Sequence, residues 1–501
     1  MEKDRTNYKK HLHRVDLFYW GIVIISLLTC CDTIVKDPEP EPASILAIVS
    51  GYSVQLTGSS KGPWFSDNLS VATVSSTGLV TAVGAGKTTI YTYSSTGEQQ
   101  IVCYLEVNPK RNILFYIATD ADATIDRDTP AKINQIRAGW QPDQGEMLIY
   151  VDRRGQGALL LQMNNILTDG FYGVDTLDVY GVENSADAVI FTRMIDKLLS
   201  YPADSYGLLF FSHASGWLPA GALNNPRSSE INRQQIELLN PSEVDLRTLV
   251  IDNGGGPRYE MEYDDFAAAI PDNSLDFIIF EACLMADVMS MYELRNKAEY
   301  VLVSSAEIVS PGFSHIYIND IMRLYNTKES IETVVSGFAQ AYHDFIVTQF
   351  PENNELCSST LGLIKMSEIQ NLATTVKTAL NNTKIDESTL TVNEIQRFDR
   401  LSLISSGQRS YRYFDLDHVI ENLASGSQYA AFRTQMDKTV VWKASTKRFL
   451  LGNYGNGNPY YTRYDGFFIE RHSGLSTYIE QEIYPVLNAA YQNSAWYRAI
   501  Y

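Results

Sequence analysis

The chain has 501 residues, more than a single hydrophobic core usually organises, so two or three domains are expected. Hydrophobic residues make up 45% and charged residues 20%, which excludes a wholly disordered or fibrous protein. The formal net charge is −19 at pH 7 and there is no dense run of lysine and arginine, which argues against nucleic-acid binding. The five cysteines form neither a disulfide framework nor a CxxC metal pattern.

Residues 1–30 are typical of a bacterial export signal. A basic start precedes an apolar stretch at 17–29, which is too short to span a bilayer comfortably but suits a signal peptide. The ending "SLLTCCD" resembles the lipobox of bacterial lipoproteins, with Cys31 as the lipidated residue and Cys30 as the alternative. We therefore expect export and a lipid anchor in the cell envelope, on the periplasmic or surface face of the outer membrane. An ordinary signal peptide or an uncleaved anchor is the other interpretation.

Two segments separate this signal from the larger part of the chain. Residues 31–42 are acidic and proline-rich, which predicts an extended tether rather than a core. Residues 43–108 alternate β-branched and polar residues between Gly, Ser and Thr turns, which predicts a small β-sandwich. With Trp64 and "SDNLSVATVSSTGLVTAVGAGKTTI" in this order, the segment resembles a bacterial immunoglobulin-like group-two domain. Cys103 lies on its last expected strand and is interpreted as a core residue.

From residue 111 onward, apolar runs alternate with amphipathic segments. The apolar runs are continuous, as expected of strands that are buried on both faces of a sheet. Between them, "ADAVIFTRMIDKLLS" and "LMADVMSMYELRN" place apolar residues at helical spacing. The pattern predicts a layered α/β fold with a largely parallel sheet. The expected strands are residues 112–118, 146–152, 206–212, 275–281 and 299–305.

A histidine and a cysteine each follow one of these expected strands. His213 stands in "FFSHASGW" and Cys283 in "FIIFEACLMADVMSMYEL", and functional groups gather beyond the carboxyl ends of parallel strands. A cysteine hydrolase needs a thiolate, an imidazole and amide donors for the oxyanion. We expect Cys283 at the start of a helix, whose dipole favours the thiolate. The amides of Ala214 and Cys283 would hold the oxyanion, and Ser212 or backbone would orient the imidazole.

These motifs in this order resemble the clostripain-like cysteine peptidases, which share a structural clan with gingipains, legumains and caspases. The resemblance rests on "HASGW", "EACLMADVMSMYEL", "SSAEIVSPGF" and "HSGLSTYIEQEIYP", and it covers roughly residues 111–501. It implies a caspase-like layered sheet with helices on both faces. It also implies a cysteine endopeptidase that forms a thioester, with Cys283 as the nucleophile and His213 as the general base and acid.

The resemblance further implies how protein or peptide substrates bind. It assigns substrate binding to Glu281, Ser305 and Glu307, and cleavage after Arg or Lys follows from the acidic residue two positions before the cysteine. The sequence departs from the family pattern at three positions: Ala214 replaces glycine, Ser212 replaces aspartate and Glu281 replaces aspartate. A catalytically inactive relative that serves as a surface binding or adhesion protein is therefore the alternative function.

Three further predictions concern maturation, metal binding and oligomeric state. The resemblance implies cleavage in the loop at 218–248, for which Arg227 and Arg233 are the candidates, although the segment also fits a plain surface loop. The other histidines, including His472, have no ligands at metal spacing, so we expect no metal and assign them no catalytic role. Asp252 in "LVIDNGGGPRYE" fits a turn or a substrate or calcium role, so calcium is the one possible cofactor. The sequence leaves the oligomeric state open.

Overall fold

The structure is a computed structural model that describes residues 44–56, 63–121, 123–219, 251–252, 259–399, 411–451 and 466–501. The predicted signal peptide and tether, Cys30 and Cys31, and the processing candidates Arg227 and Arg233 lie outside these residues. For 251–252 only the backbone is described, so the side chain of Asp252 is not placed. Within the described ranges, no helix combines the length and the hydropathy that a membrane crossing requires.

The described residues between 44 and 108 contain seven strands in two small sheets. Their alternating side chains enclose a separate core that includes Val80, Ile90 and Leu105. Cys103 is buried in this core, as predicted, and burial raises the pKa of its thiol. One sheet has the order β1-β7-β6-β3 and the other β2-β5-β4. The strands are β1 (Ser44–Val49), β2 (Ser53–Gln55), β3 (Phe65–Ser66), β4 (Ala72–Val74), β5 (Leu79–Ala82), β6 (Gly86–Tyr93) and β7 (Gln99–Asn108).

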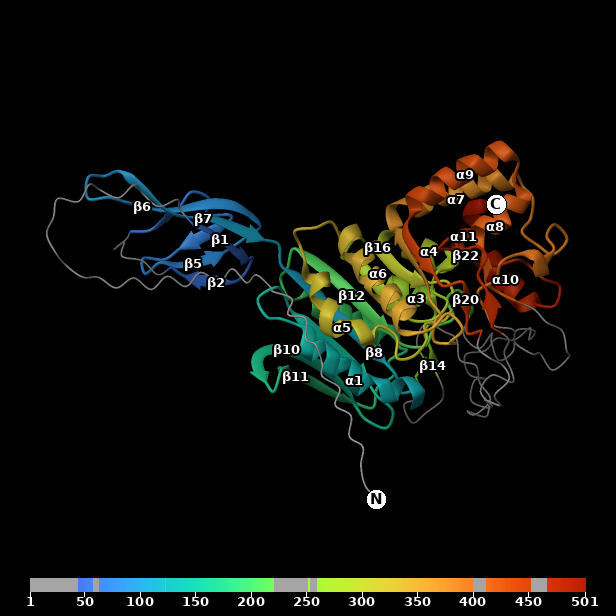
Figure 1. The fold of residues 1–501 in the computed structure, drawn as a ribbon, viewed down its shortest axis with the longest axis horizontal. Helices are drawn as coiled ribbons and strands as arrows, with labels where there is room; N and C mark the ends of the chain where they lie inside the picture. The colour runs from blue at the N-terminus through green and yellow to red at the C-terminus, as the bar shows by residue number, and fades with distance from the viewer. Residues whose placement is uncertain are drawn as a thin grey trace, which may run out of the picture. The chain divides into compact units, whose positions relative to one another are not determined.

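A nine-stranded sheet organises the larger part of the chain (Figure 1). Its order is β11-β10-β9-β8-β12-β15-β16-β17-β19. The five central strands β9, β8, β12, β15 and β16 are parallel to one another. All other neighbouring pairs in this sheet are antiparallel. The predicted parallel sheet is thus confirmed for its centre. The strands are β8 (Arg111–Ala118), β9 (Met147–Asp152), β10 (Ala158–Thr168), β11 (Phe171–Gly181), β12 (Ser205–Phe211), β15 (Leu275–Glu281), β16 (Ala298–Ser304), β17 (Thr360–Lys365) and β19 (Val440–Ser445).

Helices cover both faces of this sheet, and the C-terminal helices α7 to α11 gather together (Figure 1). The helices are α1 (Ala123–Gly139), α2 (Ala188–Leu199), α3 (Tyr263–Ala268), α4 (Val288–Glu293), α5 (Ser314–Asp320), α6 (Ile331–Gln349), α7 (Ile369–Leu380), α8 (Leu416–Leu423), α9 (Gly426–Thr439), α10 (Pro485–Asn493) and α11 (Ala495–Ile500). Short strand pairs are β13 (Ile251–Asp252) with β14 (Tyr259–Glu260), β18 (Phe414–Asp415) with β22 (Ser476–Thr477), and β20 (Arg448–Phe449) with β21 (Phe467–Phe468).

The parallel strands read as continuous apolar runs because each lies between two cores. Successive side chains of a strand point to opposite faces. On β15, Phe277 and Ile279 join the core that contains α1, α5 and α6, whereas Ile278 and Phe280 join the core that contains α2, α3, α4 and α7. Glu281 stands two residues after Ile279, so its side chain points to the same face of the sheet, which α1 and α5 cover.

Candidate active site

The ends of β12 and β15 bring the predicted histidine and cysteine to neighbouring positions. The two strands are parallel, and Phe211 at the end of β12 is the register partner of Glu281 at the end of β15. His213 and Cys283 each follow two residues later, at the same edge of the sheet. Both side chains are half-buried, while Ala214 and the surrounding turn residues are buried. The register therefore brings residues 213 and 283 to the same edge of the sheet, and both are partly exposed to solvent.

The turn after Cys283 differs from the sequence expectation. Helix α4 begins only at Val288, five residues after the cysteine, and its N-cap is Asp287. The prediction that Cys283 begins a helix is therefore wrong, and a helix dipole does not act directly on its thiol. Leu284 instead adopts a left-handed conformation with φ of 61°, which is rare for a bulky residue. Its amide donates to the carbonyl of Ala306 at 2.9 Å, which fixes the turn against the segment that follows β16.

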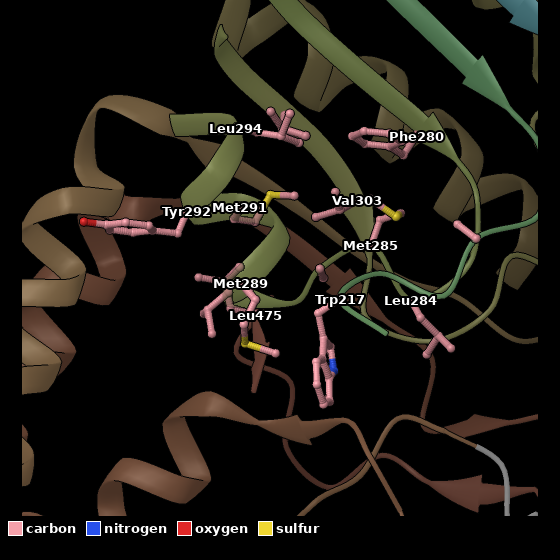
Figure 2. Close-up of a cluster of buried hydrophobic side chains, with 14 of the residues drawn as sticks. Trp217, Phe280, Leu284, Met285, Met289, Met291, Tyr292, Leu294, Val303 and Leu475 are labelled. Atoms are coloured by element: carbon pink, nitrogen blue, oxygen red, sulfur yellow. The ribbon is translucent and has the colours of Figure 1, made fainter. Parts of the chain in front are cut away.

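The turn that carries His213 is held by residues from distant parts of the chain. Tyr413 donates its hydroxyl hydrogen to the carbonyl of Ser215, and the Trp217 ring packs 4.7 Å from that of Tyr478. Trp217 also belongs to the cluster shown in Figure 2, where side chains from this turn, from the turn at 282–287 that contains Cys283, and from the C-terminal segment meet. Ala214 is not among the described residues with positive φ, so its amide has an ordinary backbone geometry.

Glu281 does not lie where its predicted substrate-binding role requires. Its side chain is 1% exposed and forms an ion pair with Lys132 of α1, with Nζ 2.5 Å from Oε1. The Phe313 amide donates to the same oxygen at 2.5 Å, and the Tyr317 hydroxyl donates to Oε2 at 2.8 Å. Strand alternation explains this position, because Glu281 faces α1 and α5. The carboxylate is fully engaged inside the protein, so the prediction that it binds a substrate cation is wrong for this structure.

The other two predicted substrate-binding residues follow β16, the strand next to β15. Ser305 is buried, and its hydroxyl lies 3.2 Å from Nε2 of His472, a histidine to which sequence reasoning assigned no role. Burial lowers the pKa of His472 to about 3, with Lys443 contributing, so the imidazole is neutral. Glu307 is half-buried two residues beyond Ser305. Because the carbonyl of Ala306 accepts a hydrogen bond from the amide of Leu284, Ser305 and Glu307 lie beside the turn that contains Cys283.

A second buried carboxylate, Asp287, follows Cys283 by four residues and caps α4. It is fully buried and accepts hydrogen bonds from the amide and the hydroxyl of Ser290 at 2.8 and 2.7 Å. Within the described residues it has no ion-pair partner, and burial raises its pKa to about 7. Its Oδ2 faces Gly216, which has φ of 56° and lies in the histidine turn. Sequence reasoning missed this contact, although an aspartate before an apolar helix is a recognisable N-cap signal.

The described residues contain no group of three His, Cys, Asp or Glu side chains that could hold a metal ion. The prediction of a possible calcium requirement stays a prediction.

Comparison with known proteins places the chain in a family. The model of the clostripain family, also called peptidase family C11, matches residues 116–496, and that of the bacterial Ig-like domain (group 2) matches residues 47–104. No curated protein matches the chain. A structure described as an inactive zymogen C11 protease from Parabacteroides distasonis is 27% identical, with a TM-score of 0.60 over 79% of this chain and 99% of that one. A secreted C11 cysteine protease from Bacteroides thetaiotaomicron in complex with an irreversible peptide inhibitor is 24% identical, with a TM-score of 0.61 over 78% and 99%.

These matches and the sheet that carries the histidine and the cysteine make the chain a cysteine peptidase. It belongs to the clostripain family, because the family model covers most of its length. An immunoglobulin-like domain of bacterial type precedes the peptidase part.

Proposed function

We propose that the chain is an endopeptidase in which Cys283 is the nucleophile and His213 is the general base and acid. The observation that carries this proposal is the register of β12 and β15, which ends both strands at the same level two residues before these side chains. His213 takes the thiol proton, the Cys283 sulfur attacks the scissile carbonyl carbon, and the amides of Ala214 and Cys283 bind the oxyanion. The C–N bond breaks as His213 protonates the leaving amine, and water then hydrolyses the thioester.

The test of this mechanism is peptide hydrolysis by purified protein that has been nicked proteolytically. A fluorogenic coumarin peptide should be cleaved by the wild type, and Cys283→Ala should abolish turnover. His213→Ala should lower kcat by several orders of magnitude while the protein stays folded. Absence of turnover by the nicked wild-type protein would instead favour a binding or adhesion role.

We propose a preference for Arg or Lys before the scissile bond, with Glu307 as the acid that meets the basic side chain. Glu281 is enclosed in the protein with Lys132, and Glu307 is partly exposed in the segment beside the turn that contains Cys283. A carboxylate in a partly desolvated site attracts guanidinium and ammonium groups strongly. Glu307→Gln should raise KM for Arg and Lys peptides at least tenfold and leave cleavage after uncharged residues unchanged. Equal loss for all substrates would contradict this assignment.

We propose that cleavage after Arg227 or Arg233 activates the protein. Both residues lie in a long polar segment after the histidine turn, and the C11 protease of 27% identity is described as an inactive zymogen. Active wild-type protein should run as two fragments on a denaturing gel, whereas Cys283→Ala should remain whole. A single intact but active species would refute this proposal.

We propose that the protein is exported and attached to the cell envelope through a lipid on Cys31. The basic and apolar N-terminus, the "SLLTCCD" ending and the Ig-like domain support this location. Cys31→Ala should move the protein from the membrane fraction to the soluble fraction, while Cys30→Ala should remain in the membrane. The reverse result would assign the lipid to Cys30.

A further inference from the structure

The two strand ends that carry the catalytic pair are joined beneath the site. Phe211 and Glu281 are register partners and stand two residues before His213 and Cys283. Both side chains point to the face of the sheet covered by α1 and α5, because Phe211 belongs to that core and the Glu281 carboxylate meets Tyr317 of α5 there. Any group that contacts both side chains therefore acts on the spacing of the two catalytic segments.

Lys132 is such a group. It lies on α1, is fully buried, and places its ammonium 2.5 Å from the Glu281 carboxylate and 4.1 Å from the centroid of the Phe211 ring. A cation over an aromatic face is attracted by the ring quadrupole, and this attraction increases when both groups are desolvated. One ammonium thus holds a residue of β12 and a residue of β15 through two different interactions.

The same ammonium also reaches the segment after β16. Nζ donates to the carbonyl of Pro311 at 3.2 Å, and the Phe313 amide donates to the carboxylate oxygen that Lys132 contacts. Gly312 lies between these two groups with φ of 63°, and a side chain there would overlap the Glu281 carboxylate. The Lys132–Glu281 pair is therefore the meeting point of three segments, and these carry His213, Cys283 and the predicted substrate-binding residues.

We propose that Lys132 is a positioning residue that fixes His213 and Cys283 relative to each other. The proposal rests on the function proposed above, and it gives Glu281 an internal role in place of substrate recognition. Lys132 touches neither catalytic side chain in this scheme. It acts through Phe211 and Glu281, and small displacements of reacting groups lower rates about 100-fold.

The variants Lys132→Met and Lys132→Met/Glu281→Gln test the proposal. The single variant keeps the apolar stem but leaves a buried carboxylate without a cation, so it loses stability as well. The double variant removes that charge, and its amide oxygen still accepts from Tyr317 or Phe313. Arg111→Met is the matched control, because Arg111 is also a buried cation but lies at the amino ends of β8 and β12, where it donates to Ser205 at 2.7 Å.

Three measurements separate positioning from stability: the denaturation midpoint, kcat and KM for a peptide, and the pH dependence of Cys283 alkylation by iodoacetamide. The double variant should regain most of the midpoint lost in Lys132→Met, yet keep a kcat about 100-fold below the wild type with KM changed less than threefold. In the double variant, alkylation of Cys283 should require a higher pH than in the wild type, because the thiolate is no longer stabilised by an aligned imidazole. Arg111→Met should lower the midpoint without moving this profile.

Recovery of kcat in parallel with stability in the double variant would overturn the proposal, as would an unchanged alkylation profile in both Lys132 variants. An equal shift in Arg111→Met would also overturn it, because any buried cation would then suffice. If the wild type cleaves no peptide, the proposed function fails by itself. The alkylation comparison needs no turnover and still decides whether Lys132 sets the environment of Cys283.

Discussion

Two buried carboxylates stand before and after Cys283 in the sequence, and their surroundings differ. Glu281, two residues before Cys283, pairs with the ammonium of Lys132. Asp287, four residues after Cys283, accepts hydrogen bonds from the amide and hydroxyl of Ser290 and has no ion-pair partner among the described residues, and burial raises its pKa to about 7. Burial alone disfavours a charged carboxylate, whereas an adjacent cation stabilises it. The carboxylate before Cys283 is thus held by an ion pair, whereas burial brings the pKa of the one after it to about 7.

The largest effect should come from neutralising the paired carboxylate. Glu281→Gln preserves size but leaves the buried Lys132 ammonium without a counter-charge, which costs about 3–5 kcal/mol of unfolding free energy. Asp287→Asn preserves size and removes no cation partner within the described residues, so at pH 8 it should be neutral or stabilising. Chemical denaturation of both variants measures the contrast. Equal destabilisation would show that the two carboxylates are held in the same way.

The second largest expected effect is the contribution of Asp287 to the pH dependence of the unfolding free energy. Its folded-state pKa of about 7 lies above the unfolded value, so the folded protein binds the extra proton between about pH 4 and pH 7. Stability from this group is therefore greatest at low pH and falls as pH rises to about 7, by roughly 1 kcal/mol per pH unit near its steepest part. Burial, with Asp287 contributing, raises the pKa of Tyr263 in α3, so Tyr263 does not titrate in this range. Asp415 is also buried with a raised pKa and adds a decline of the same sign, so Asp287→Asn should make the slope less steep without abolishing it. An unchanged slope would assign the decline to other groups.

A glycine approaches each carboxylate, and substitution of the two glycines compares the packing on the two sides. A Cβ added to Gly312 would overlap the Glu281 carboxylate, and one added to Gly216 would overlap the Asp287 carboxylate and the Leu284 carbonyl. Both glycines have positive φ. Alanine costs about 1 kcal/mol for the left-handed backbone alone, which Gly155→Ala measures because nothing lies near its Cβ position. Gly312→Ala and Gly216→Ala should cost about 1–3 kcal/mol more, from overpacking. Thermal unfolding of the three variants checks this order, and three equal costs would refute it.

The sequence predicts the sheet better than it predicts the surroundings of the site. The strand runs ending near Phe211 and Glu281 are identified within one residue, because strands buried on both faces leave continuous apolar segments. The helix after Cys283 is placed too early, because apolar spacing begins at Met285 whereas the cap at Asp287 decides where the helix begins. The burial of Glu281 follows from its strand position, but its partner Lys132 is 149 residues away and no local pattern links the two.

The smallest predicted effect concerns the hydrogen bond from the Ser290 hydroxyl to Asp287. Ser290→Ala removes the hydroxyl that donates to Oδ2 at 2.7 Å but keeps the amide that donates to Oδ1. This hydrogen bond stabilises the ionised carboxylate, so its loss should raise the pKa of Asp287 further and cost about 1 kcal/mol at pH 8. Near pH 5, where Asp287 is protonated, the cost should be smaller.

Ser200→Ala is the matched control, because Ser200 is exposed at the end of α2 and its hydroxyl donates to a backbone carbonyl. It should change stability by less than about 0.5 kcal/mol at either pH. Denaturation of both variants at pH 5 and pH 8 isolates the charge-dependent part of the Ser290 hydrogen bond. An equal cost of Ser290→Ala at the two pH values would mean that Asp287 keeps one charge state between them, and the contrast with Glu281 would then lie in packing rather than in protonation.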